Sequence, residues 1–365
     1  MQRQGKTVFV LLMAAGVLFL VLAVRHGLFG KARTQGSCLP EEDAALRYPY
    51  QQLSGKEQQL YTALYDAMAA HEESVVLPYE CTADEYERIY LMVRMQEPEL
   101  FYVADTYQLA DVLTETEIRY DETAEEAAAM QRQLDRVVDE MLLTMSLQPD
   151  EGQKLLTLHD LIAKRCQYAP SSHASDIYGC LVEGVAQCEG YSKAFCYVAR
   201  KAGLQVMTIP GESDRGLGHA WNIAEIDDEF YNIDVTWDDE DYLNGAVSHR
   251  YYAMPDTRFG GHFANPSAFR VPECTADKEN YYKKYGLVLN ESSQMGTYCH
   301  QWALSYSGAT GFLEFYCPTP EIYQAVAADI RSGTAIKSAI ADLCTGGSFR
   351  YTADEQGRIV GILFE

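Results

Sequence analysis

Apolar and polar residues divide the chain into an apolar N-terminal run and several stretches with helical or strand periodicity. Residues 7–24 form an apolar run with basic residues on both sides. About 18 apolar residues are near the lower limit for a helix that spans a bilayer. A cleaved signal peptide is the alternative, but the run is long for one and no small-x-small cleavage site follows Val24. We therefore predict a short tail (1–6), an uncleaved transmembrane anchor (7–24) and a linker (25–45).

The next stretch, residues 46–149, has mostly helical periodicity. Apolar residues recur at helical spacing in candidate helices over 57–70, 82–93 and 123–145. Thr82 precedes acidic residues, as a capping residue precedes the first turn of a helix. We predict a helical N-terminal domain over this range.

The pattern changes from about residue 150 onwards. A helix is predicted over 152–166, after which glycine becomes frequent. Short apolar runs then indicate strands over 205–209, 220–226 and 230–235. Residues 150–272 are therefore predicted to form an α+β domain.

A second, smaller α+β domain is predicted over residues 287–365. Its candidate strands are 302–305, 311–316, 350–352 and 359–364, and its candidate helices are 320–332 and 334–343. The fold class predicted for the chain is α+β.

The charge and the cysteines narrow the classes of protein that fit. The formal net charge of −24 argues against a nucleic-acid partner, because phosphate binding needs a basic surface. The 10 cysteines include no pair with CxxC spacing, which argues against a zinc ribbon or a redox dithiol. A location outside the cytoplasm would allow disulfides, but the sequence does not choose between pairings. No metal site and no cofactor are predicted.

One cysteine opens a predicted helix. Apolar residues lie on one helical face from Glu189 to Lys201, and Gly203 follows as a C-terminal stop. Cys188 therefore lies at the helix N-terminus, where exposed N–H groups and the helix dipole favour a thiolate. Gly190 permits another segment to approach the first turn closely.

A histidine and an aspartate follow on two predicted strands. Asp227-Asp228 divides two apolar runs that fit a hairpin. If the loop has two or four residues, Trp221 faces Asp234, and His219 points to the same side two residues away. Asp234 is then diagonal to the imidazole and within reach to orient it. A three-residue loop would break this register.

A cysteine, a histidine and an aspartate in this order fit one mechanism, nucleophilic acyl transfer. Cys188 would attack an acyl carbon, and His219 would hold the thiolate as an ion pair and protonate the leaving amine. Asp234 would fix the imidazole tautomer and support the imidazolium. An amine or water would then resolve the acyl-thioester.

Three motifs resemble those of the transglutaminase-like superfamily, which has a papain-like cysteine fold. They are the block 184–191 around Cys188, the segment 219–222 that begins with His219, and the segment 234–238 that begins with Asp234. The resemblance covers about residues 150–265 and implies a triad of Cys188, His219 and Asp234.

Further segments extend this resemblance. Ser192-Lys193-Ala194-Phe195 is similar to the bacterial envelope members of the family. Residues 158–160 and Tyr168 resemble the family's leading helix, and residues 250–256 with His262 after them resemble the segment that closes its domain.

Other residues near the motifs are candidates for the wall of the site. The N–H of Cys188 is the expected oxyanion donor at the helix start, and the second donor is unassigned. Gln187 is a candidate donor, with a solvated loop glutamine as the alternative. Trp221 and Trp237 are expected to wall the site, although core packing would explain them equally well.

The remaining polar features are given structural roles. The acidic run 238–241 lacks EF-hand spacing and is predicted to be a solvated loop rather than a calcium site. His159, His173 and His262 are expected to support the fold.

The sequence therefore predicts a membrane-anchored enzyme whose catalytic domain lies outside the cytoplasm and acts on peptide or protein amide bonds. A protease, a transglutaminase and a deamidase share the same thioester intermediate, and the sequence does not choose between them. The predicted partners are the membrane and a peptide or protein substrate, with cell-wall peptide as one candidate; the oligomeric state is left open. The alternative is a catalytically silent binding or scaffolding module of the cell envelope.

Overall fold

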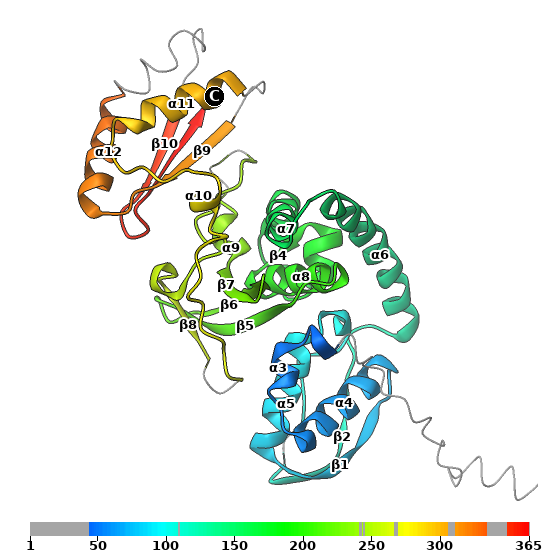
Figure 1. Ribbon diagram of the computed structural model, residues 1–365. Coiled ribbons are helices and arrows are strands. Elements are labelled where there is room, and N and C mark those ends of the chain that lie inside the picture. The colour runs from blue at the N-terminus through cyan, green and yellow to red at the C-terminus, as the bar shows by residue number, and fades with distance from the viewer. Residues whose placement is uncertain are drawn as a thin grey trace, which may run out of the picture. The chain divides into compact units, whose positions relative to one another are not determined.

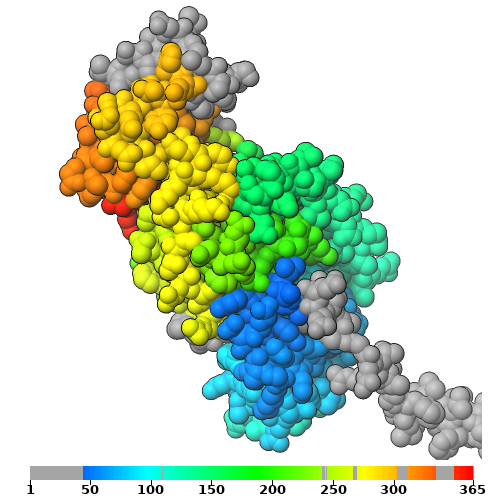
Figure 2. All heavy atoms as spheres, in the orientation of Figure 1, coloured from blue at the N-terminus to red at the C-terminus, as the bar shows by residue number. Residues whose placement is uncertain are grey.

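The structure, a computed structural model, describes residues 44–364 except 109, 241–242, 244, 266–268, 306–310 and 334–348 (Figure 1, Figure 2). The predicted tail, the predicted anchor over 7–24 and nearly all of the predicted linker lie outside the described residues, as does the predicted helix 334–343. Among the described helices, none is both long enough and apolar enough to cross a membrane.

Four long helices begin directly after residues that cap them. They are α4 (Gly55–Ala69), α5 (Ala83–Gln96), α6 (Ala124–Ser146) and α7 (Glu151–Arg165). The side-chain oxygen of the preceding residue, which is Ser54, Thr82, Thr123 or Asp150, accepts a hydrogen bond from the N–H three residues on. The helices predicted over 57–70, 82–93, 123–145 and 152–166 are confirmed.

Two strands interrupt these helices. β1 (Ser74–Thr82) pairs antiparallel with β2 (Val112–Glu117). In β1, Val75 and Leu77 are buried between exposed neighbours, which is the period of two expected of a strand. The prediction of a purely helical domain over 46–149 therefore needs correction, because this range also contains two strands. The sequence did not indicate them, because their short alternating pattern lies between longer stretches of helical periodicity. The short turns α3 (Tyr48–Gln51) and η1 (Pro98–Leu100) complete this part.

A four-stranded antiparallel sheet forms the middle of the described chain. Its strands, in spatial order, are β7 (Glu229–Ile233), β6 (Gly218–Ile226), β5 (Val206–Ser213) and β8 (His262–Ala264). The strands predicted over 205–209 and 220–226 are confirmed. The strand predicted over 230–235 ends at Ile233, because Asp234 caps the short helix α9 (Val235–Asp238).

Both faces of this sheet are buried. On β5, Val206 lies in a cluster with residues of α6, α7 and α8 (Cys188–Lys201). The next residue, Met207, points the other way and lies in a cluster with residues of α4, α5 and β1. Ala224 and Ile223 of β6 divide between the two clusters in the same way.

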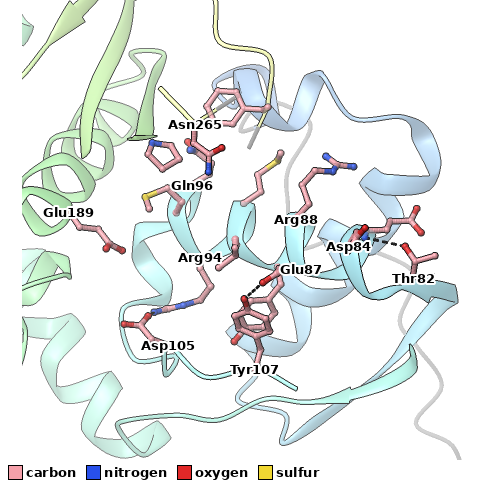
Figure 3. A pocket seen from close by; sticks show the side chains of 17 residues that line it. Thr82, Asp84, Glu87, Arg88, Arg94, Gln96, Asp105, Tyr107, Glu189 and Asn265 are labelled. Carbon is pink, nitrogen blue, oxygen red and sulfur yellow. Dashed lines mark hydrogen bonds and ion pairs between the residues drawn. The ribbon is translucent and has the colours of Figure 1, made fainter. Parts of the chain in front are cut away.

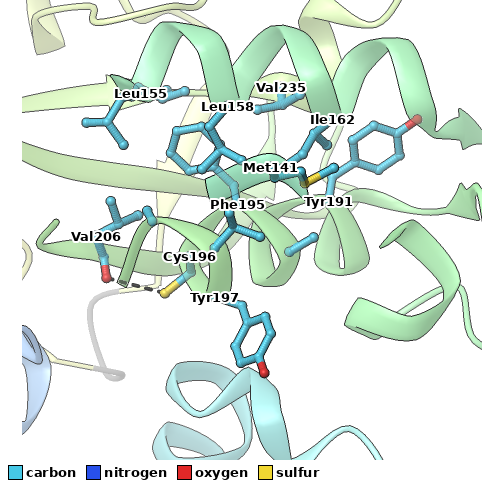
Figure 4. Packing of buried hydrophobic residues seen from close by; sticks show 14 of the residues in the cluster. Met141, Leu155, Leu158, Ile162, Tyr191, Phe195, Cys196, Tyr197, Val206 and Val235 are labelled. Atoms are coloured by element: carbon cyan, nitrogen blue, oxygen red, sulfur yellow. Dashed lines mark hydrogen bonds between the residues drawn. The ribbon is translucent and has the colours of Figure 1, made fainter. Parts of the chain in front are cut away.

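The clusters show that the predicted domain boundary between residues 149 and 150 falls inside a shared core. Met141 of α6 lies with Leu158 of α7 and Phe195 of α8 (Figure 4). On the other face of the sheet, Leu64 of α4 and Tyr86 of α5 share a core with β5 and β6. The described residues between 44 and 364 accordingly belong to one compact unit. Helical periodicity indicates which face each helix buries, but it does not indicate what covers that face.

A buried ion cluster joins α8 to the N-terminal helices. Nε of Arg47 lies 2.9 Å from both carboxylate oxygens of Glu97, and the hydroxyl of Tyr61 donates to the same carboxylate. Nη1 of Arg200 in α8 lies 3.8 Å from Glu97. The Glu97 side chain is fully buried, so its charge depends on these partners.

Replacing Glu97 by leucine should lower the free energy of unfolding by about 3–5 kcal/mol, because two buried guanidinium groups lose their shared carboxylate. Urea denaturation measures the loss. The control is Asp227→Asn, which removes an exposed pair with Lys278 (3.0 Å) and should cost at most about 1 kcal/mol. Equal effects of the two variants would contradict the role given to Glu97.

The C-terminal residues form a second antiparallel sheet with its own core. Its strands, in spatial order, are β10 (Phe349–Asp354), β11 (Ile359–Phe364) and β9 (Gly311–Tyr316). The helices α11 (Gln294–Ser305) and α12 (Pro320–Ser332) lie against it (Figure 1). The elements predicted over 311–316, 320–332, 350–352 and 359–364 are confirmed. The short helices η4 (Asp256–Arg258) and α10 (Tyr281–Lys284) precede this sheet in the chain.

The strand predicted over 302–305 is wrong, because these residues end α11. A short apolar run does not by itself distinguish a strand from a buried helix segment. Earlier in the same helix, Met295 and Cys299 are four residues apart and both buried, as one face of a helix requires.

Candidate active site

Cys188 is the first residue of α8, and its side chain is partly exposed. The chain reaches this point through the helical turn η2 (Gly179–Glu183) and the strand β4 (Val185–Ala186), which pairs in parallel with β3 (Gln167–Tyr168). The eight described cysteines, Cys188 among them, are free thiols. The buried face of α8 fixes the helix, so the thiol at its N-terminus is held in place.

The first turn of α8 contacts the loop before η2. Gln187 is the N-cap residue, and its N–H donates to the carbonyl oxygen of Ala174 at 2.8 Å. A Cβ atom at Gly190 would lie 2.5 Å from the same oxygen. The close approach predicted for Gly190 is confirmed.

The hairpin of β6 and β7 brings the histidine to the aspartate. Asp227 and Asp228 form a two-residue turn with φ of 52° and 66°, as a type I′ hairpin requires. One step beyond the last pair of this ladder, Trp221 stands opposite Asp234, which is the predicted register. Nε2 of His219 lies 2.7 Å from Oδ2 of Asp234.

Both oxygens of Asp234 are saturated with donors. Oδ1 caps α9 by accepting the N–H groups of Thr236 (2.9 Å) and Trp237 (3.2 Å). Oδ2 accepts a hydrogen bond from Nε2 of His219 and another, at 2.9 Å, from Nε2 of His262. Four hydrogen bonds therefore hold a carboxylate that is only 1% exposed.

These contacts shift the pKa of both groups. Burial raises the pKa of Asp234, but the hydrogen bonds from His219 and His262 outweigh burial and lower the pKa to about 2. Burial lowers the pKa of His219, but its hydrogen bonds to Asp234 and Cys188 outweigh burial and raise the pKa to about 9. At neutral pH His219 is therefore an imidazolium between a carboxylate and a thiol.

The two tryptophans predicted at the site lie beside the imidazole. The ring centroids of Trp237 and Trp221 are 5.0 Å and 6.1 Å from that of His219, each with an interplanar angle of 24°. Nε1 of Trp221 donates to Oδ1 of Asn232 at 3.3 Å, so this indole N–H is not available to a substrate. A substrate role for either ring, or for Gln187, stays a prediction.

Residues 140–235 match the model of the transglutaminase-like superfamily. The chain contains a transglutaminase-like superfamily domain. The matched range begins inside α6, ends directly after Asp234 and includes Cys188 and His219. The match begins inside α6, and α6 shares a hydrophobic core with α8.

Three solved structures resemble the chain that carries this transglutaminase-like domain. A TGase is 15% identical, with 39% of this chain and 47% of that chain covered and a TM-score of 0.28. A candidate cysteine protease from Cytophaga hutchinsonii is 14% identical (36% and 40% covered, TM-score 0.27). A candidate protease from Parabacteroides distasonis is 8% identical (72% and 61% covered, TM-score 0.28). The chain thus spans 40% to 61% of the length of these structures. None of the curated proteins compared with the chain matches it.

The transglutaminase-like site includes one histidine whose role the sequence motifs did not indicate. His262, at the start of β8, places Nε2 on Asp234 and Nδ1 at 3.0 Å from the carbonyl oxygen of Gly260. Its ring stacks on Phe259 with centroids 3.8 Å apart. The expectation that His262 only supports the fold therefore needs correction, because this ring orients the same carboxylate as His219. Only its place in the closing segment of the domain pointed to it.

Replacing His262 by phenylalanine should move the acid limit of thiol reactivity to higher pH. The variant removes a hydrogen bond that lowers the pKa of Asp234, so this carboxylate is protonated at a higher pH. A hydrogen bond to a charged group contributes about 1.5–3 kcal/mol, which corresponds to roughly one to two pH units. The pH dependence of Cys188 alkylation measures the shift. His262→Gln, whose amide N–H can replace the lost donor, should restore most of it; an unchanged acid limit in the phenylalanine variant would contradict the role.

The acidic run after the third motif is not a solvated loop. Asp238 is fully buried and accepts the N–H of Tyr251, Asp239 accepts the hydroxyl of Tyr191, and Glu240 pairs with Arg250. Asp241 lies outside the described residues. The expectation of exposure is wrong for residues 238–240, because neighbouring donors bind these side chains, and it is untested for Asp241.

A cavity of about 930 Å³ lies beside Glu189, the residue after Cys188 (Figure 3). Helix α5 supplies most of one wall, with Met92 and Met95 among the apolar residues. The rest of the lining includes Glu189 of α8, Pro210 of β5, and Asn265 and Phe269, which follow β8 in the chain.

Charged residues make up much of the polar lining of this cavity. The hydroxyl of Tyr90 is buried away from solvent and therefore does not face the cavity. The lining holds five carboxylates and two arginines. Each arginine is paired with an acid, Arg88 with Glu57 and Arg94 with Asp105. Two of the carboxylates are paired with lysines, Glu85 with Lys56 (3.4 Å) and Glu189 with Lys193 (2.6 Å), which leaves Asp84 and Glu87 without an ion pair among the described residues. The cavity therefore favours a ligand with positive charge.

Proposed function

We propose that this protein is a cysteine acyl-transfer enzyme that acts on peptide or protein amide bonds. The observation that carries the proposal is the position of His219, whose Nε2 lies 2.7 Å from Asp234 and whose imidazole lies close enough to Cys188 for the thiol to raise its pKa. An imidazolium beside a thiol at a helix N-terminus favours the thiolate–imidazolium pair that attacks acyl carbons.

The reaction would proceed in two steps. The Cys188 sulfur attacks the carbonyl carbon of an amide, and the C–N bond breaks as His219 gives its proton to the leaving amine. The N–H of Cys188, at the start of α8, donates to the oxyanion. Water or a second amine then attacks the thioester, gives its proton to His219 and releases the sulfur. Asp234 holds the imidazole in the orientation that both steps require.

The cavity beside Glu189 would hold the acyl donor. Its lining includes Glu189, the residue after the nucleophile in α8, although none of the three triad residues, and it combines apolar walls with an excess of carboxylates. A peptide segment with apolar residues and a basic side chain fits this lining.

Replacing Met95 by tryptophan should lower kcat/KM about tenfold or more, because the larger ring occupies the cavity and displaces the acyl donor from the thiol. Alkylation of Cys188 by the small reagent iodoacetamide should not change. The control is Leu143→Trp on the exposed side of α6, which should leave both rates unchanged. If Met95→Trp turned over peptide normally, the acyl donor would bind elsewhere.

We further propose that residues 7–24 anchor the enzyme in the cell membrane with the catalytic domain outside the cytoplasm. The length of this apolar run supports the proposal. Cell-wall peptides would then be within reach as substrates.

Trapping of the acyl-enzyme tests the proposed function. The full chain is incubated with a cell-wall peptide extract, quenched in acid and digested, and the peptide that contains Cys188 is analysed by mass spectrometry. The expected result is an added acyl mass that neutral hydroxylamine removes, as it removes a thioester. Absence of any adduct on Cys188 under conditions in which the extract is consumed would refute the proposal, as would an adduct on another residue. If the extract is not consumed, a catalytically silent module is the better interpretation.

A further inference from the structure

A second histidine–carboxylate cluster lies at the opposite end of α9 from Asp234. Its members are His159 and Asp160 on α7, Asp238 at the end of α9, His249, and Glu314 on β9. All but Asp160 are buried, and none has a part in the proposed reaction. The cluster thus joins three separate parts of the fold.

Two imidazole nitrogens converge on one carboxylate oxygen. Nδ1 of His159 lies 3.2 Å and Nε2 of His249 lies 3.0 Å from Oδ1 of Asp160. The three atoms all lie within 4.8 Å of one another. Ligands at about 2.0–2.1 Å from one zinc ion lie roughly 3.0–3.4 Å apart, so the two nitrogen–oxygen distances fit ligands of a single ion.

The opposite nitrogens of both rings are held by other carboxylates. Nε2 of His159 lies 3.1 Å from Oδ2 of Asp238, and Nδ1 of His249 lies 2.9 Å from Oε1 of Glu314. Histidines that bind metals usually donate their second N–H to a carboxylate in this way, which fixes the tautomer. Glu314 is itself held by the hydroxyl of Tyr282 at 3.0 Å.

Each of the four ring nitrogens faces a carboxylate oxygen, so the two rings can be imidazolium donors or neutral metal ligands. If each outer nitrogen carries its proton toward Asp238 or Glu314, the inner nitrogen of each neutral ring points at Asp160 without a hydrogen. Two lone pairs opposite a negative oxygen repel one another unless positive charge lies between them. One divalent cation supplies that charge and offsets most of the charge of the three carboxylates.

We propose that His159, Asp160 and His249 bind a divalent transition-metal cation, for which Zn²⁺ is the best fit. Two imidazoles and one carboxylate are borderline ligands that suit zinc. The second oxygen of Asp160 lies 3.6 Å from Nζ of Lys164 and stays outside the ligand set. The ion fixes α7 to His249 and, through Glu314, to the C-terminal sheet. It also fixes Asp238 and so the end of the short helix that Asp234 caps.

Zinc binding by the full chain tests this site. The protein is dialysed against a chelator, titrated with Zn²⁺ by calorimetry, and analysed for bound metal and thermal stability. The expected result is one tightly bound Zn²⁺ per chain with a raised midpoint of thermal unfolding. His249→Gln and Asp160→Asn should each weaken binding by about a hundredfold or more while the apo-protein keeps its circular dichroism spectrum. The matched control is His173→Gln, which removes a histidine outside the cluster, paired with Asp176 at 2.8 Å and with Glu122 at 3.9 Å, and should bind Zn²⁺ as the wild type does.

Two further variants separate this site from the proposed active site. Zn²⁺ binding should persist in Cys188→Ala and in His262→Gln, because neither residue belongs to the cluster. Absence of tight binding to the wild type would overturn the proposal. So would binding that survives both His249→Gln and Asp160→Asn, or binding that is lost with Cys188. None of these outcomes depends on turnover, so this site and the proposed function fail or stand separately.

Discussion

Replacing Cys188 by alanine should abolish acyl transfer, with turnover reduced by roughly a factor of 10⁵ or more. No other described cysteine can replace it, because the other seven are buried whereas Cys188 is partly exposed beside His219. The fold should persist, because the change removes one partly exposed atom at the start of α8 and should cost less than about 1 kcal/mol. Turnover of the peptide identified by acyl-enzyme trapping measures the loss of activity, and urea denaturation measures the change in stability.

The control for this variant is Cys81→Ala, which removes a buried thiol from β1. It should keep full turnover even if the protein loses some stability. Turnover in Cys188→Ala near that of the wild type would show that the nucleophile is elsewhere.

Replacing Asp234 by asparagine should lower turnover by roughly 10³–10⁴-fold. The amide oxygen can still accept the N–H groups of Thr236 and Trp237, so α9 stays capped. The amide NH₂ then faces His219 and needs an acceptor there. Nε2 of His219 must then be unprotonated to accept this hydrogen bond, so the ring is neutral and carries its proton on the other nitrogen. The imidazolium that the reaction uses is therefore lost.

The same variant should change the pH dependence of kcat/KM. In the wild type, His219 keeps its proton up to a pKa of about 9, so the rate should fall as the pH rises through that value. Without the carboxylate the pKa of His219 falls, and the decline should begin at lower pH. Asp228→Asn, in the exposed turn of the same hairpin, should leave the profile unchanged. A wild-type profile in Asp234→Asn would refute the role of Asp234.

The local geometry of the site could be predicted from the sequence because it depends on short-range rules. Two consecutive aspartates formed the turn, and the period of two along β6 and β7 then placed His219 and Asp234 on one side. The buried face of α8 placed Cys188 at a helix start. Each of these inferences used residues within one or two elements.

The parts that failed depend on partners far away in the chain. Helical periodicity did not show that α6 packs with α8, or that β5 and β6 share a core with α4 and α5. His262 lies 28 residues beyond Asp234 and meets it only through the pairing of β8 with β5. The buried state of Asp238 depends on His159 and on the backbone of Tyr251, neither of which has a sequence signal.

Activation of Cys188 by His219 can be measured without any substrate, from the rate of alkylation by iodoacetamide at neutral pH. The rate is followed for Cys188 by peptide mass spectrometry in the wild type and in His219→Ala. We expect fast modification of Cys188 in preference to the other thiols, and loss of that preference in His219→Ala. Equal reactivity of Cys188 in both proteins would show that His219 does not activate the thiol.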